Sequence, residues 1–294
     1  MGGKTLHPLV SVIDLSKVDL SSHTDIKFGF YTLLLSECKC EACAYGHQWY
    51  DFSDGTLVCL SPGESISIKE DNKRLPSKGW ILAFHPDLIC GTPLGLSIED
   101  YTFFSYRPEE ALHVSLREKQ IILEFLEKIN QELQYCIDRH SKRIISKYIE
   151  LLLDYCARFY ERQFITRCEA NKKILKELNH LLDMWFNTKI SKNTNSQTSS
   201  STQTSSNMLT NEYCANLLHL SPAYLNDLLV FETGKSFKEY IQFKRFEVAK
   251  DWLQHTDKPL NQIAQELGFS NSQYFSRIFK KITGCSPNEF RTPN

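Results

Sequence analysis

Short apolar runs dominate the first third of the chain. Segments such as FGFYTLLL (28–35), TLVCL (56–60) and WILAF (80–84) are rich in β-formers, and turn-forming clusters such as SDG and SPGE separate them. Short strands joined by tight turns are typical of antiparallel sheets. We therefore expect a small β-sandwich or barrel over residues 1–114.

From Ser115 onward the apolar spacing becomes helical. Ser115 and Glu118 form an S-x-x-E capping box, after which apolar residues recur every three or four positions. A second amphipathic helix opens at Ser141, and a third covers about residues 174–186. Two roles are open for 115–190: these helices cover the sheet, or part of an apolar stripe forms a homodimer contact.

A polar tract interrupts the chain at residues 191–207. Apart from Lys192, every residue of this tract is Ser, Thr, Asn or Gln. Such a composition cannot offset the entropy of ordering by burying apolar surface. The tract therefore predicts a flexible linker before a separate domain at 208–294.

This last region contains one helical pattern twice. SPAYLNDLLVFETGKS (221–236) and SQYFSRIFKKITGCS (272–286) align at a spacing of fifty residues. Each follows a shorter helical segment in which a small residue, Ala215 or Ala264, permits close helix crossing. The pattern predicts two helix-turn-helix units, with residues 237–254 as a long helix between them.

Capping residues support this assignment. Thr210 and Ser221 are suited to begin the two helices of the first unit. In the second unit, Gly268 suits a turn with positive φ, and Ser270 with Gln273 matches an S-x-x-Q capping box. Two rigidly joined recognition helices could enter successive major-groove openings, which lie about 34 Å apart on one face of a duplex.

At its end the chain resembles the AraC/XylS family of bacterial transcription regulators. The matching string is IAQELGFSNSQYFSRIFKKITGCSPNEFR (263–291), which ends in a Gly-x-x-Pro-x-x-aromatic-Arg arrangement; the resemblance covers roughly 85 residues. YDFSDGTLVCLSPGE (50–64) and GWILAFHPDLICGTPLG (79–95) are similar, less specifically, to the cupin-like sensor domains of that family.

The resemblance implies an α+β protein with four parts. These are a cupin-like sensor domain (1–114), a helical dimerisation or covering segment (115–190), the linker (191–207) and an all-α DNA-binding domain with two helix-turn-helix units (208–294). It implies double-stranded DNA as a partner, homodimerisation on adjacent half-sites, RNA polymerase as a partner of an activator, and control by a small-molecule effector. A regulator without an effector, controlled by a protein partner or by its own abundance, is the alternative.

The predicted DNA contacts surround the outward faces of the two repeated helices. Gln suits adenine edges, Arg suits guanine or phosphate, and Lys suits phosphate, whereas Asp accepts only from cytosine and repels phosphate. The set is Ala223, Asn226 and Asp227 on the first helix, Arg245 on the connecting helix, and Ser272, Gln273, Ser276, Arg277, Lys280 and Lys281 on the second.

Only the second copy is strongly basic. Where it has Lys280 and Lys281, the first copy has Val230 and Phe231, and the family often has basic residues near the position of Val230. Three explanations are open: the first unit reads bases with little electrostatic gain, these two residues face a neighbouring domain or subunit, or DNA affinity is weakened. Residues 208–294 contain ten Lys and Arg against nine Asp and Glu, so we expect modest affinity that depends on dimerisation.

The whole-chain composition adds limits. A net charge of −1 gives no general attraction to nucleic acid. No apolar run suits a signal peptide or a membrane-spanning helix, so we expect a cytoplasmic protein that does not contact membranes, with its ten cysteines reduced.

Metal binding and catalysis are the remaining alternatives. Cys38, Cys40, Cys43 and His47 offer enough ligands for zinc, but their spacing is not that of a structural zinc finger. Reduced structural cysteines are favoured over bound metal or redox sensing. The other histidines of the β region, including His85 and His113, are isolated, and the cysteine spacing does not fit a DNA-repair alkyl acceptor. We expect no enzyme activity, metal or cofactor.

Overall fold

The computed structural model describes residues 6–17, 25–27, 29–36, 51–67, 78–193 and 209–291, of which 25–27, 65–67 and 187–193 are described by their backbone alone. Contacts divide the chain into two compact units. Unit 1 comprises residues 1–168 with 220–224, and unit 2 comprises residues 169–219 with 225–294.

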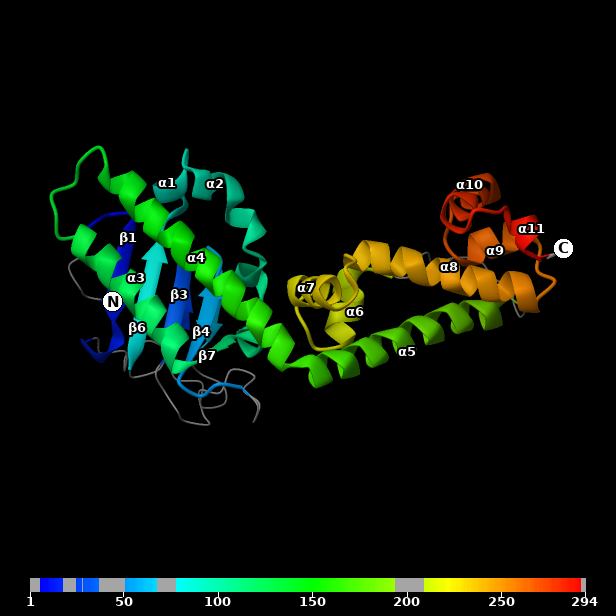
Figure 1. The fold of residues 1–294 in the computed structure, drawn as a ribbon, viewed down its shortest axis with the longest axis horizontal. Helices are drawn as coiled ribbons and strands as arrows, with labels where there is room; N and C mark the ends of the chain where they lie inside the picture. Colours follow the sequence, from blue (N-terminus) through cyan, green and yellow to red (C-terminus); the bar gives the residue numbers. More distant parts are fainter. Residues whose placement is uncertain are drawn as a thin grey trace. The chain divides into compact units, whose positions relative to one another are not determined.

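Unit 1 is built on an antiparallel sheet of five strands in the order β1-β6-β3-β4-β7 (Figure 1). Strand β2 pairs with β5 in a second, two-stranded sheet. With the helical character of unit 2, this confirms the predicted α+β class. The strands are β1 (Val10–Asp14), β2 (Asp25–Lys27), β3 (Tyr31–Ser36), β4 (Gly55–Leu60), β5 (Ser65–Ser67), β6 (Gly79–Phe84) and β7 (Leu112–Val114).

Eleven α-helices occur in the described residues, together with 3-10 helices at Leu15–Lys17, Ile98–Asp100, Thr102–Ser105 and Pro108–Glu110. None of these helices is long and apolar enough to cross a membrane. The α-helices are α1 (Pro86–Ile89), α2 (Pro93–Ser97), α3 (Leu116–Glu132), α4 (Ser141–Thr166), α5 (Cys168–Asn193), α6 (Asn211–Leu217), α7 (Pro222–Thr233), α8 (Phe237–His255), α9 (Leu260–Glu266), α10 (Ser272–Thr283) and α11 (Pro287–Arg291).

Both faces of the central strands are buried, which explains their uninterrupted apolar runs. Leu34 lies opposite Val58 and Ile81, and all three belong to one core cluster. On the other face, Cys59 approaches Cys156 of α4, and burial raises the pKa of both thiols. Helices α3 and α4 cross this face of the sheet (Figure 1).

The predicted start of α3 is confirmed in atomic detail. The Ser115 hydroxyl accepts from the amide of Glu118, and the Glu118 carboxylate accepts from the amide of Ser115 at 2.8 Å. Arg162 of α4 donates to the same carboxylate and to the carbonyl of His113, so the cap also ties α3 and β7 to α4.

The helix after Arg167 extends further than its apolar pattern predicts. Helix α5 runs to Asn193, three residues into the predicted linker; residues 194–208 lie outside the described part of the chain. This helix groups with unit 2 and not with the helices that cover the sheet. Tyr240 of α8 donates to Asn179 at 2.7 Å, and Leu178 and Leu182 are fully buried.

Near the end of α4, unit 1 contains a buried ion pair. The guanidinium of Arg167 donates to both carboxylate oxygens of Asp51, over 2.9 and 2.6 Å, and the Asp51 side chain is fully buried. Because both charges are removed from water, the pair stabilises the fold only as long as both partners are present.

We expect Asp51→Ala to lower the free energy of unfolding by about 3–5 kcal/mol, because it removes the carboxylate that balances the buried charge of Arg167. Urea denaturation of the full chain measures this. Lys17→Ala removes one partner of the exposed pair with Asp14 and should change stability by less than about 1 kcal/mol. Equal effects of the two substitutions would contradict a structural role for the buried pair.

Candidate nucleic-acid interface

The second helix-turn-helix consists of α9, a tight turn and α10. Ile263 and Ala264 of α9 and Leu267 at its end are buried. Gly268 adopts a left-handed conformation with φ of 78°, as the sequence predicts. The short side chain of Ala264 is buried where α9 packs against α10, which agrees with the prediction that a small residue here lets the two helices cross closely.

The orientation of α10 is set by an aromatic cluster. Phe246 of α8 contacts Phe269, Phe275 and Phe279, with ring centroids 5.7 to 6.4 Å apart. Phe290 of α11 packs edge-on against Phe279. These contacts bury one face of α10 and leave the opposite face to solvent.

A second set of contacts holds α9 to the end of α8. The buried carboxylate of Glu266 accepts from Lys258 at 2.6 Å and from Gln262 at 2.8 Å. The Lys258 ammonium also lies 4.2 Å from the centroid of the Trp252 ring, and Arg291 donates to the Lys258 carbonyl. The supporting helix α9 is therefore anchored to the segment that follows α8.

One capping prediction is wrong. The N-cap of α10 is Asn271, whose side chain accepts from the amide of Tyr274 at 2.6 Å, and not Ser270. The turn after α9 is one residue longer than the turn after α6, where Thr210 and Ser221 take the predicted capping positions. Phe269 lies in this longer turn and joins the aromatic cluster.

The outward face of α10 gathers the predicted polar and basic side chains. Gln273, Arg277, Lys280 and Lys281 are exposed, whereas Ser272 and Ser276 are half-buried. The Arg277 guanidinium lies 5.5 Å from the centroid of the Tyr274 ring. Among the described residues, no carboxylate forms an ion pair with these three cations, so their charges are available to an anion.

Tyr274 is a candidate contact that the sequence analysis did not single out. Its side chain is 42% exposed, beside Arg277 on the same face. Its alignment with the buried Tyr224 of the first copy concealed this difference, since Tyr224 is only 3% exposed.

On α7 the predicted face has other partners. The Asn226 carbonyl oxygen accepts from the amide of Phe237 at 3.0 Å, and its amide lies 3.3 Å from the Asp227 carboxylate. Asn226 therefore supports the start of α8, and pairing with adenine would require these bonds to break. Val230 and Phe231 are 46% and 41% exposed, and Ala223 is half-buried in the stretch that groups with unit 1.

Arg245 of α8 lies near the turn of the second unit. It is half-buried, and burial lowers its pKa. A Cβ placed on Gly268 would lie 3.8 Å from its Nη2, and its Nε has no hydrogen-bond partner among the described residues. A phosphate near this turn could satisfy that buried donor.

The sequence also contains candidates for metal binding. Cys38, Cys40, Cys43 and His47 lie outside the described residues. His113 is fully buried and lies 3.3 Å from the Thr56 hydroxyl, and His85 caps α1 by accepting from Asp87. Within the described ranges, no group of three or more His, Cys, Asp or Glu could hold a metal ion.

Comparison with known proteins identifies the same region as a helix-turn-helix domain. Residues 214–293 match the model of a helix-turn-helix domain. An arabinose operon regulatory protein from Salmonella typhimurium is 40% identical over 72 residues, which cover 24% of this chain and 26% of that protein. Residues 214–293 form an AraC-type DNA-binding domain.

Two further relatives are named as transcriptional regulators. The regulator YtdP of Bacillus subtilis is 42% identical over 83 residues, 28% of this chain, and the match spans only 11% of that longer protein. The regulator YijO of Escherichia coli is 25% identical over 237 residues, which cover 81% of this chain and 76% of the relative. The AraC-type domain is thus the part for which similarity is strong.

Substitutions in the turns of the two helix-turn-helix units should change stability in opposite directions. His219 adopts a left-handed conformation with φ of 57°, whereas Gly268 adopts one at no steric cost. We expect His219→Gly to raise the free energy of unfolding by about 0.5–1 kcal/mol and Gly268→Ala to lower it by about 1–2 kcal/mol. Urea denaturation of the full chain measures both. A loss of stability in His219→Gly would contradict a left-handed turn after α6.

Proposed function

We propose that this DNA-binding transcription regulator reads its operator chiefly through α10. The exposed basic face of α10 carries this proposal, because Arg277, Lys280 and Lys281 have no ion-pair partner among the described residues. Gln273 and Arg277 contact base edges in the major groove, and the two lysines contact phosphates. Ser272 and Ser276, half-buried on the same helix, add phosphate or sugar contacts.

Helix α7 contributes less to affinity. Asp227 repels phosphate, Asn226 is engaged at the start of α8, and the positions equivalent to Lys280 and Lys281 are apolar. Ala223 then acts through apolar contact, and Asn226 acts as a neutral polar group, so neither contributes charge. Arg245 completes the set by donating to a phosphate beside the Gly268 turn.

The protein binds adjacent half-sites as a homodimer. The charge balance of residues 208–294 permits few phosphate contacts per copy, so linking two copies supplies affinity that one copy lacks. Part of the apolar stripe on α4 remains exposed, with Ile144 and Leu151 37% and 47% exposed, which supports a dimer contact there. Unit 1 responds to a small-molecule effector, and RNA polymerase is the partner of an activator.

Selection of binding sites from random duplex DNA with the full chain tests the proposal. Paired elements about one helical turn apart would show that both recognition helices of one chain read bases, and a repeat of such an element beside it would support a dimer on adjacent half-sites. A single short element would contradict paired half-sites, and failure of a folded protein to enrich any sequence at low salt, with and without cell metabolites, would contradict the proposed function.

Arg277→Ala should weaken binding to the selected site by about 1–3 kcal/mol while leaving stability unchanged, because the side chain is exposed. Fluorescence anisotropy with labelled duplex measures this. Lys238→Ala, a matched change at an exposed position of α8, serves as the control. Equal affinities for Arg277→Ala and the unsubstituted protein would remove Arg277 from the interface.

Asp227→Arg should strengthen binding to non-specific duplex and steepen its dependence on salt, because a carboxylate that repels phosphate is replaced by a cation. The slope of log affinity against log salt should grow by about 1. Asp251→Arg on α8 makes the same charge change at an exposed position and serves as the control. Identical slopes for the two variants would place α7 away from the DNA backbone.

A further inference from the structure

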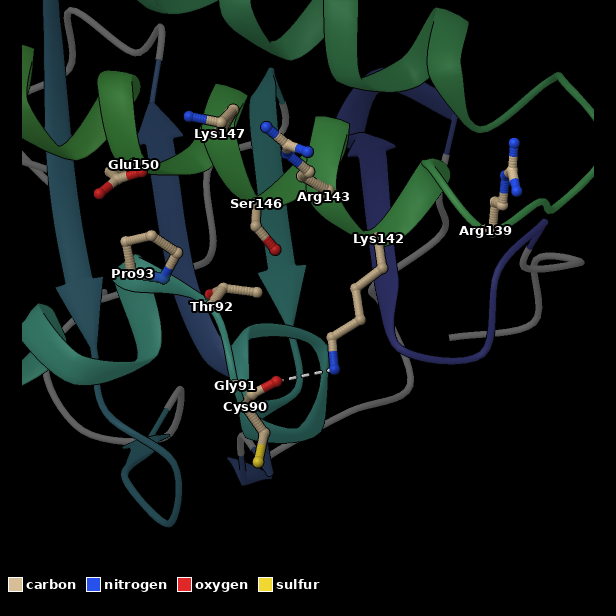
Figure 2. A pocket seen from close by; sticks show the side chains of 10 residues that line it. All are labelled: Cys90, Gly91, Thr92, Pro93, Arg139, Lys142, Arg143, Ser146, Lys147 and Glu150. Carbon is tan, nitrogen blue, oxygen red and sulfur yellow. Dashed lines mark hydrogen bonds between the residues drawn. The ribbon is translucent and has the colours of Figure 1, made fainter.

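Unit 1 contains a cavity of about 500 Å³ between the start of α4 and the segment that joins α1 to α2. One wall is formed by Cys90, Gly91, Thr92 and Pro93, and the other by Arg139 and residues of α4 (Figure 2). Its volume lies within the range of small-molecule sites. The wall residues come from two segments about fifty residues apart, so tertiary packing creates the hollow.

Positive charge dominates the lining. The lining contains one carboxylate, that of Glu150, and four cations: Arg139, Lys142, Arg143 and Lys147. Figure 2 shows Arg139 and Glu150 at opposite ends, with the other cations between them. In the described part of the chain, none of these four cations forms an ion pair, and like charges four residues apart on a helix, such as Arg143 and Lys147, repel each other.

The site is held in shape by bonds that do not neutralise it. The Lys142 ammonium donates to the carbonyls of Asp87 and Cys90, over 3.1 and 2.8 Å. The Ser146 hydroxyl donates to the Leu88 carbonyl, and the Thr92 hydroxyl donates to Ile89 at 2.6 Å. These partners are neutral, so α1 and α2 are fixed against α4 while the positive charge is retained.

We propose that this cavity binds a small organic anion with at least two negative charges. Arg143 and Lys147 form charge-assisted hydrogen bonds to its phosphate or carboxylate groups, Lys142 offers its third N–H, and Glu150 accepts from a hydroxyl of the ligand. The concave shape and limited volume favour a small molecule over the extended backbone of a duplex. The proposed anion site does not depend on the DNA contacts. That the bound anion acts as an effector rests on the proposed function.

Isothermal titration of the full chain with pyrophosphate tests the site, and citrate provides a carboxylate probe of comparable charge. Sodium chloride at matched ionic strength separates binding from screening. The unsubstituted protein should bind pyrophosphate or citrate, and the stronger of the two indicates whether phosphate or carboxylate is preferred. No binding of either anion beyond the effect of salt would overturn the proposal.

Arg143→Gln with Lys147→Gln should weaken this binding at least about tenfold, because two charge-assisted contacts are lost. The control is Arg117→Gln with Lys128→Gln, which removes the same charge from exposed positions of α3 outside the cavity. The control should bind as the unsubstituted protein does. Equal weakening in both double variants would show a general charge effect and overturn the assignment.

Measuring the binding of the selected DNA distinguishes the proposed anion site from the proposed regulatory function. If Arg143→Gln with Lys147→Gln weakens DNA binding without any added anion, the cavity residues contact nucleic acid, and the small-molecule assignment is wrong. A different result is possible: the protein enriches no DNA sequence, and Arg143→Gln with Lys147→Gln weakens pyrophosphate or citrate binding while the control double variant does not. In that case the anion site is supported and the proposed regulatory function is wrong.

Discussion

The position of the proposed reading helix depends on the packing of Phe246 against the second helix-turn-helix. This side chain of α8 contacts Phe269 in the turn and Phe275 and Phe279 on α10, so one residue fixes both the turn and the rotation of the helix. Gln273 and Arg277 project outward because Phe275 and Phe279 point inward at intervening positions. The chemistry of the outer face is therefore set by apolar contacts on the inner one.

Features with local causes could be predicted from the sequence. The capping box of Ser115 and Glu118 and the left-handed Gly268 depend on residues within a few positions, and both are confirmed. The start of α10 could not be predicted correctly, because Ser270 and Asn271 are both good caps. Phe269 is buried beside this turn, and its packing is a tertiary contact that the local sequence does not indicate.

Prediction of the candidate site from the sequence is limited in the same way, because features that depend on tertiary contacts are missed. The exposure of Gln273, Arg277, Lys280 and Lys281 followed from helical periodicity. The bond from Phe237 to Asn226 spans eleven residues, and no periodic pattern indicates it. The basic cavity escaped prediction for a related reason: charged residues at the start of α4 are typical of a solvated helix face, and only the packing of α1 and α2 makes that face concave.

The asymmetry between the two repeated helices has a physical rationale. A domain with two strongly basic helices would bind any duplex tightly, because phosphate contacts do not depend on sequence. Concentrating the cations on α10 and placing Asp227 on α7 lowers this non-specific term while leaving the proposed base contacts of α10 intact. In the proposed dimer, occupancy of an operator requires two copies in the correct arrangement, so a ligand that changes how the two copies pair would change binding steeply.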